Sequence, residues 1–237
     1  MYKLVDPLIR LILTFVLAPN ILFAQQKSIA YDNQQWLQYY QTLQVSNRIS
    51  ILNDVGYRVK DVLQRRSQYL VRTMVSWQVG KEAKVGVGIG HWGSFRTKGL
   101  GRIEIRPHLN FSTRHQQGKW VFSHRLRGEQ RFFQSVNPSG DHVSNIRIRY
   151  RLIGKFPLVQ FLDSSPISGL DMLLGNEVML NLGESIAYNV FDQNRVLAGT
   201  LLKVSPALHI SLLYQHRFQA LNQPAAYRQL YILWLGI

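Results

Sequence analysis

Apolar and polar residues alternate along most of the chain after residue 35. A period of two places apolar side chains on one face of a β-strand and polar side chains on the other. Gly, Asn, Ser and Pro separate about eleven such runs, which begin near Gln35, Arg48, Gln68, Lys84, Arg102, Lys119, Val143, Leu170, Val190, Leu208 and Tyr227. Because no segment of useful length after residue 24 has helical periodicity, the pattern predicts an all-β domain.

The length of these runs indicates a membrane barrel. Each run is about as long as the ~9–11 residues that a tilted strand needs to cross a bilayer. We therefore expect a closed antiparallel up-and-down transmembrane β-barrel, in which every backbone group has a partner. Bacterial single-chain barrels have even strand numbers, so the expected count is about 12, with about 10 as the alternative. Phe156 to Leu162 is the candidate for the remaining strand.

The first residues differ from the rest of the chain. Lys3 and Arg10 give a basic start, residues 11–18 are apolar, and Ala24 precedes a polar stretch. This arrangement is typical of a secretory signal, and a short N-terminal helix of a cytoplasmic protein is the alternative. We expect residues 1–24 to be a signal peptide, residues 25–237 to be the barrel, and the protein to reside in the outer membrane of a Gram-negative bacterium.

The last run alternates up to the final residue, with Tyr231, Leu233, Leu235 and Ile237 on one face. Outer-membrane barrels resemble this ending, which their assembly machinery reads. The expected partners are therefore outer-membrane lipid and the barrel-assembly machinery, through the C-terminal strand. An ordinary closing strand of a soluble barrel is the alternative.

Charge adds a second feature. The chain has 28 Lys+Arg against 13 Asp+Glu, a formal net charge of +15, and no cysteine, which excludes disulfides and thiolate chemistry. Because a lipid-facing Arg costs ~2–4 kcal/mol at the midplane, the arginines within the runs must face the lumen. The predicted lumen charge network comprises Arg58, Arg72, Arg102, Glu104, Arg106, Arg125, Arg127, Glu129, Arg131, Arg147, Arg149, Arg151, Glu177, Asp192 and Arg195.

Charge pairing also predicts one register. A two-residue turn at Gln117-Gly118 would set Glu104 opposite Arg131 and place another Arg–Glu pair beside them, Arg106 with Glu129. In the run before this hairpin, Gly86, Gly88 and Gly90 alternate with apolar residues. We expect a strand whose inner face is bare, which leaves room for bulky lumen arginines or for a bend.

Several functions are compatible with a basic lumen. The network is expected to be mainly structural, and a weak anion site or pore is a further possibility because arginines outnumber carboxylates. The alternatives are a soluble periplasmic barrel that binds an anionic or lipidic ligand, and a lipid-modifying barrel enzyme. The histidines are scattered among serines without a catalytic or metal-ligand spacing, so we expect no catalytic residue, no metal and no cofactor. Nucleic acid is not an expected partner, because the bases lie within alternating strands.

Several strings resemble one known family. They are Tyr57-Arg58, Arg125-Leu126-Arg127-Gly128-Glu129-Gln130-Arg131-Phe132, Arg147-x-Arg149-x-Arg151, Asn176-Glu177 and Phe191-Asp192-Gln193-Asn194-Arg195, with Trp36 soon after the signal. Together they resemble domain-of-unknown-function family 2490, over nearly all of residues 30–237. The resemblance implies an exported, barrel-like protein of Gram-negative bacteria and carries no catalytic residues.

Overall fold

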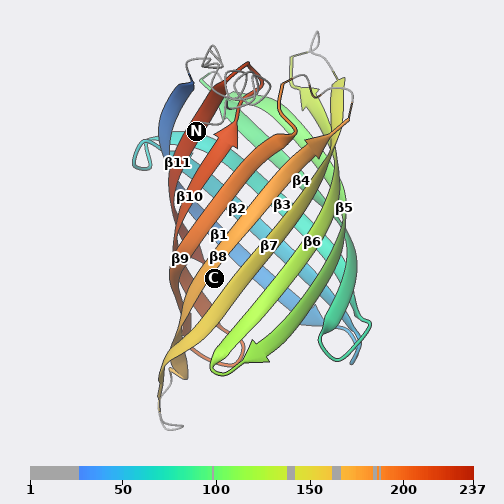
Figure 1. Cartoon of the computed structure of the whole chain (residues 1–237), viewed down its shortest axis with the longest axis vertical. Helices are drawn as coiled ribbons and strands as arrows, with labels where there is room; N and C mark the ends of the chain where they lie inside the picture. The colour runs from blue at the N-terminus through green and yellow to red at the C-terminus, as the bar shows by residue number, and fades with distance from the viewer. Residues whose placement is uncertain (1–26, 98, 138–141, 162–166, 184–185, 187) are drawn as a thin grey trace, which may run out of the picture.

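The computed structural model describes residues 27–97, 99–137, 142–161, 167–183, 186 and 188–237. Within these residues the chain forms eleven strands that close into one barrel (Figure 1). The strands are β1 (Ser28–Gln44), β2 (Ile49–Lys60), β3 (Arg65–Gln78), β4 (Ala83–Arg96), β5 (Gly99–Gln117), β6 (Trp120–Ser135), β7 (His142–Gln160), β8 (Gly169–Leu182), β9 (Phe191–Lys203), β10 (His209–Ala220) and β11 (Ala226–Gly236). The predicted signal peptide, residues 1–24, lies outside the described residues.

The all-β closed barrel is confirmed, but the expected even strand number is wrong. Consecutive strands pair antiparallel, whereas β1 and β11 pair in parallel, from Ser28 opposite Ala226 to Gln38 opposite Gly236. A parallel closing pair joins two strands that run the same way, which requires an odd number. The segment proposed as a further strand instead continues β7, which extends to Gln160.

The two ends of the barrel are distinct and need names. We call the end where β1 begins the proximal end; it also carries the β2–β3, β4–β5, β6–β7, β8–β9 and β10–β11 connections. The other end, where β1 finishes and β2 begins, is the distal end, at the bottom of the barrel in Figure 1. Within the described residues, no helix is long and apolar enough to cross a membrane.

The strand pleat sorts side chains between the lumen and the outer surface. On β7, Ile148 and Tyr150 are 39% and 47% exposed, whereas Arg147 and Arg149 are only 2% and 6% exposed. The same alternation leaves large apolar side chains exposed around the barrel, for example Leu37, Val55, Val71, Ile89, Ile105, Leu126, Val196, Leu212 and Leu233. The barrel is therefore apolar outside and polar inside, the reverse of a soluble barrel with an apolar core.

Aromatic side chains gather on the outer face near both ends. At the distal end, the Trp120 ring lies 5.2 Å from that of Phe156 and 5.8 Å from that of Phe122, measured between centroids. At the proximal end, the ring centroids of Phe218 and Tyr227 are 5.0 Å apart. These two clusters flank the apolar outer belt.

The predicted register of the β5–β6 hairpin is wrong by two residues. The turn residues are Gly118 and Lys119 rather than Gln117 and Gly118, since Gln117 pairs with Trp120. Gly118 has φ +59°, which suits a two-residue turn with glycine at its first position. His108, and not Arg106, therefore lies opposite Glu129.

Candidate functional site

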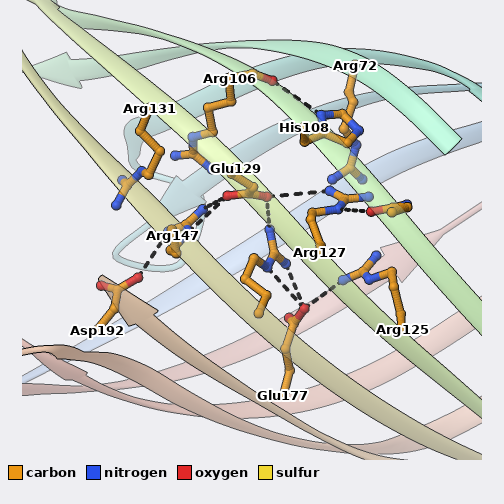
Figure 2. A network of polar contacts seen from close by, with 12 residues as sticks. Arg72, Arg106, His108, Arg125, Arg127, Glu129, Arg131, Arg147, Glu177 and Asp192 are labelled. Carbon is orange, nitrogen blue, oxygen red and sulfur yellow. Dashed lines mark hydrogen bonds and ion pairs between the residues drawn. The ribbon is translucent and has the colours of Figure 1, made fainter. Parts of the chain in front are cut away.

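Carboxylates and arginines form a closed ion-pair network on the proximal side of the lumen (Figure 2). The Glu104 carboxylate accepts hydrogen bonds from Arg106 Nε at 2.5 Å, Arg106 Nη2 at 2.7 Å and Arg131 Nε at 2.6 Å. Such a bidentate arrangement satisfies the planar guanidinium and both carboxylate oxygens. Glu104 is thus neutralised by two arginines, one on its own strand and one on the next.

Glu129 is the centre of a second, neighbouring group of ion pairs. Its Oε2 accepts from Arg147 Nε at 2.9 Å and Nη2 at 2.5 Å, and its Oε1 accepts from Arg149 Nη1 at 2.6 Å. Arg147 also donates through Nη1 to Asp192 Oδ2 at 3.0 Å. We call Glu104, Arg106, Glu129, Arg131, Arg147 and Asp192 the proximal network. It ties β5, β6, β7 and β9 together across the lumen.

Four further arginines lie on β6 and β7, toward the distal end. The pairing places Arg125 directly opposite Arg151 and Arg127 directly opposite Arg149. We call these four residues the arginine quartet. Like charges directly opposite across a sheet are destabilising by about 0.2–1 kcal/mol a pair, so the quartet needs counter-charge.

The quartet has too few carboxylates for its charge. Glu177 Oε1 accepts from Arg125 Nη2 at 2.6 Å and from Arg149 Nη2 at 2.8 Å (Figure 2). Arg127 donates to Asn110 Oδ1 at 2.6 Å, and its Nη1 is 3.6 Å from Glu129 Oε1, too far for a hydrogen bond. Arg151 has no hydrogen bond or ion pair within the described residues. The four guanidinium groups of the quartet therefore have only two nearby carboxylates, Glu177 and Glu129, and Glu129 is shared with Arg147.

A cavity of about 810 Å³ opens from the quartet toward the distal end. Its lining reaches the β3–β4 turn at Lys81 and Glu82, which places its mouth at that end. Three carboxylates line it, Asp54, Glu82 and Glu177, against eleven cationic side chains, Arg58, Arg72, Lys81, Lys84, Arg106, Arg114, Arg125, Arg127, Arg149, Arg151 and Arg195. We call it the distal cavity. Its wall is strongly cationic.

Aromatic rings hold other arginines in the lumen. The guanidinium of Arg58 lies 3.8 Å from the Trp36 ring centroid, and that of Arg217 lies 4.9 Å from it. Arg106 lies 3.8 Å from the ring of Trp92. Because a desolvated cation–π contact is worth about 2 kcal/mol, these rings partly replace carboxylates as partners. Trp36 also joins Leu230 and Ile232 in the buried cluster beside the β1–β11 seam.

The structure brings most of the predicted network residues together in the lumen. The lumen also contains three other predicted residues, Arg58, Arg72 and Arg195. Arg72 binds Asp54, and Arg195 Nη1 is 3.6 Å from Glu177. Arg102 differs, because it lies near the proximal start of β5, is exposed, and stacks over Phe133 at 5.0 Å. It is a rim residue rather than part of the network.

Two lumen features were missed. Arg217 is buried at 7% exposure, and the alternation of β10 already placed it on the inner face. Asp171 is 1% exposed and binds Lys203 at 2.8 Å, with Lys155 at 3.5 Å. The alternation of β8 puts Asp171 on the same face as Glu177, so spacing on that strand could have found it.

The glycines of β4 accommodate neighbours other than arginines. A Cβ on Gly88 would lie 2.7 Å from His108 Nε2, and one on Gly90 would lie 2.4 Å from the Trp92 ring. The expected room is therefore filled by Trp92 and His108. Among the described residues, no group of three His, Asp or Glu side chains could hold a metal ion.

Comparisons with known proteins agree with the resemblance inferred from the sequence strings. The chain matches no curated protein and no solved structure. One family model matches residues 33–228, which run from β1 into β11 and include the proximal network and the quartet. Its description is "Protein of unknown function (DUF2490)", and since the match covers most of the barrel, the chain belongs to this family.

Proposed function

We propose that this protein is an outer-membrane β-barrel that is braced inside by ion pairs and binds small anions in its distal cavity. One observation carries the anion proposal: eleven cationic side chains and only three carboxylates line that cavity. Cations concentrated in a low-dielectric recess raise the local concentration of anions and hold them more strongly than bulk water would allow.

The outer surface supports the membrane location. Exposed aliphatic side chains such as Val71, Ile105 and Leu212 form a belt, and aromatic clusters flank it at each end. Lipid-facing apolar side chains and aromatic girdles are the usual features of outer-membrane barrels. A soluble periplasmic barrel that binds an anionic or lipidic ligand is the second candidate, since the same cavity would serve it.

Binding rather than conduction is favoured by the filled proximal half. Buried side chains from several strands lie there, among them Glu129, Arg147 and Leu230. An ion that entered from the distal end would meet the paired groups of the proximal network. We therefore expect anions to enter and leave through the distal mouth.

Two experiments test this function. Fractionation of Gram-negative cells that express the full chain should place it in the outer membrane, and extraction without detergent would favour the soluble alternative.

Equilibrium dialysis of the folded protein in detergent should detect inorganic phosphate binding. Arg151→Gln should weaken that binding, whereas Arg48→Gln, which removes an exposed charge outside the cavity lining, should not. Absence of phosphate binding would refute the anion proposal.

A further inference from the structure

Side chains that line the distal cavity carry buried hydrogen-bond donors that lack a partner. Among the described residues that line it, the buried side-chain atoms without a hydrogen-bond partner are Arg58 Nε, Arg125 Nε, Arg127 Nη1 and Trp234 Nε1. All four are donors, and no buried acceptor in the described lining lacks a partner. Because eleven cationic donors and only three carboxylates line the cavity, it favours a ligand group that only accepts. Phosphate and carboxylate groups are of this kind.

The cavity also has two chemically different walls. Strands β6 and β7, which carry the arginine quartet, lie halfway around the closed ring from β1 and β11. Opposite the quartet, the lining includes the apolar side chains Trp36, Leu52, Leu70 and Trp234, beside the polar Gln38, Asp54 and Arg58. The Trp36 and Trp234 ring centroids are 5.4 Å apart, so the two indoles form one surface. An inorganic anion would use only the basic wall.

The size of the cavity fits an organic ligand. Pockets for small molecules have volumes of about 300–1,000 Å³, and they combine an apolar lining with a few polar groups that fix orientation. The distal cavity, at about 810 Å³, falls in this range of volume, and its mainly polar lining includes several apolar side chains. A bare phosphate would leave most of it filled by water against apolar side chains.

From these observations we propose that the distal cavity binds an amphipathic organic anion. A phosphate or carboxylate head would accept hydrogen bonds from Arg125, Arg127 and Arg151, and an aromatic or aliphatic body would lie against Trp234 and Leu52. The inference rests on the proposed anion binding and adds the chemical class of the ligand.

Isothermal titration of the folded full chain in detergent micelles tests the ligand class with three probes: inorganic phosphate, phenyl phosphate and benzyl alcohol. Phenyl phosphate should bind at least about tenfold more tightly than inorganic phosphate, because its ring is removed from water. Benzyl alcohol, which has the ring without the charge, should bind more weakly than either phosphate. Equal affinity for the two phosphates would overturn the amphipathic ligand while leaving anion binding intact. Failure of both phosphates to bind would overturn both proposals.

Variants locate the two halves of the ligand. Trp234→Leu should reduce the preference for phenyl phosphate over inorganic phosphate, whereas Arg151→Gln should weaken both phosphates by about tenfold. Leu52→Asn is a second test of the apolar wall, away from the β1–β11 seam, in case Trp234→Leu does not fold. Arg48→Gln should change none of these affinities. Retention of the full preference in a folded Trp234→Leu or Leu52→Asn variant would contradict the proposed position of the ring.

Discussion

The proximal network and the arginine quartet use the same residue type in opposite ways. In the proximal network, Arg147 donates to both Glu129 and Asp192, and Arg106 grips Glu104 with two nitrogens. In the quartet, two pairs of arginines face each other across β6 and β7, and Arg151 makes no hydrogen bond or ion pair among the described residues, although Glu177 lies opposite it on β8. Both regions are inside the same barrel, and they share two strands.

The difference shows what decides the role of a lumen arginine. An arginine with two carboxylates is part of the scaffold, since removing it leaves buried charge uncompensated. Arg149 of the quartet also meets this description, because it donates to Glu129 and Glu177. Arg127 and Arg151 make no hydrogen bond to a carboxylate among the described residues, so they have binding capacity left for a ligand. The same substitution made in each region can therefore separate the effect on folding stability from the effect on anion binding.

The largest effect is expected from Arg147→Gln. This change removes three charge-assisted hydrogen bonds and leaves Glu129 and Asp192 with less counter-charge. Breaking a buried pair by removing one partner costs about 3–5 kcal/mol of folding free energy. A urea titration, followed by heat-modifiable gel mobility, measures the loss. If Arg147→Gln were as stable as the wild type, the proximal network would not stabilise the fold, and the contrast with the quartet would be refuted.

Asp54→Asn should move stability and binding in opposite directions. Asp54 binds Arg72 and accepts from Gln38 Nε2 at 3.2 Å at the edge of the distal cavity. Loss of the charged partner should cost about 1.5–3 kcal/mol, typical of a hydrogen bond to a charged group. Phosphate affinity should rise, because the cavity loses one of its three carboxylates. Urea titration and equilibrium dialysis give the two readouts, and a fall in affinity would count against an electrostatic cavity.

Gly88→Ala tests how tightly the lumen is filled beside the proximal network. The new Cβ would lie 2.5 Å from the backbone oxygen of Thr73 and 2.7 Å from His108 Nε2, so the β3–β4 pairing must shift. Overpacking of this kind costs about 1–3 kcal/mol. Gly128→Ala is the matched control, since its Cβ would meet nothing within 4 Å. Equal stability of the two variants in urea would show that this part of the lumen is loosely packed.

The alternation of residues predicted most of the fold, because each strand shows its two faces locally. The alternating runs found in the sequence correspond to the eleven strands. The pattern around Arg147, Ile148 and Arg149 predicted which side chains share a face. The closure was not predictable in this way. The alternation of apolar and polar residues does not indicate whether the first and last strands pair parallel or antiparallel. The expectation that bacterial barrels have an even number of strands led to the wrong count.

The partners of each arginine were less predictable than its face. They depend on register, and a choice of turn residues that was one position too early misplaced Arg106 and Glu129 relative to each other. Gly118 carried the missing signal, because its positive φ favours the first position of the turn. Glu177 and Asp192 come from β8 and β9, so only the closed barrel shows which arginines they reach.

The smallest effect on stability is expected from Arg151→Gln, on the same strand as Arg147. The change removes a like charge opposite Arg125 and a counter-charge opposite Glu177, and it breaks no hydrogen bond within the described residues. These two effects oppose each other, so the folding free energy should change by less than about 1 kcal/mol. The effect should appear when phosphate is added. A ligand that binds only the folded state stabilises it by an amount that grows with the logarithm of its concentration relative to the dissociation constant, and a concentration of about 100 times that constant is worth about 2.7 kcal/mol. Phosphate should therefore raise the urea midpoint of the wild type more than that of Arg151→Gln. Equal shifts would mean that phosphate binds elsewhere, and a large loss without phosphate would place Arg151 with Arg147 in the scaffold.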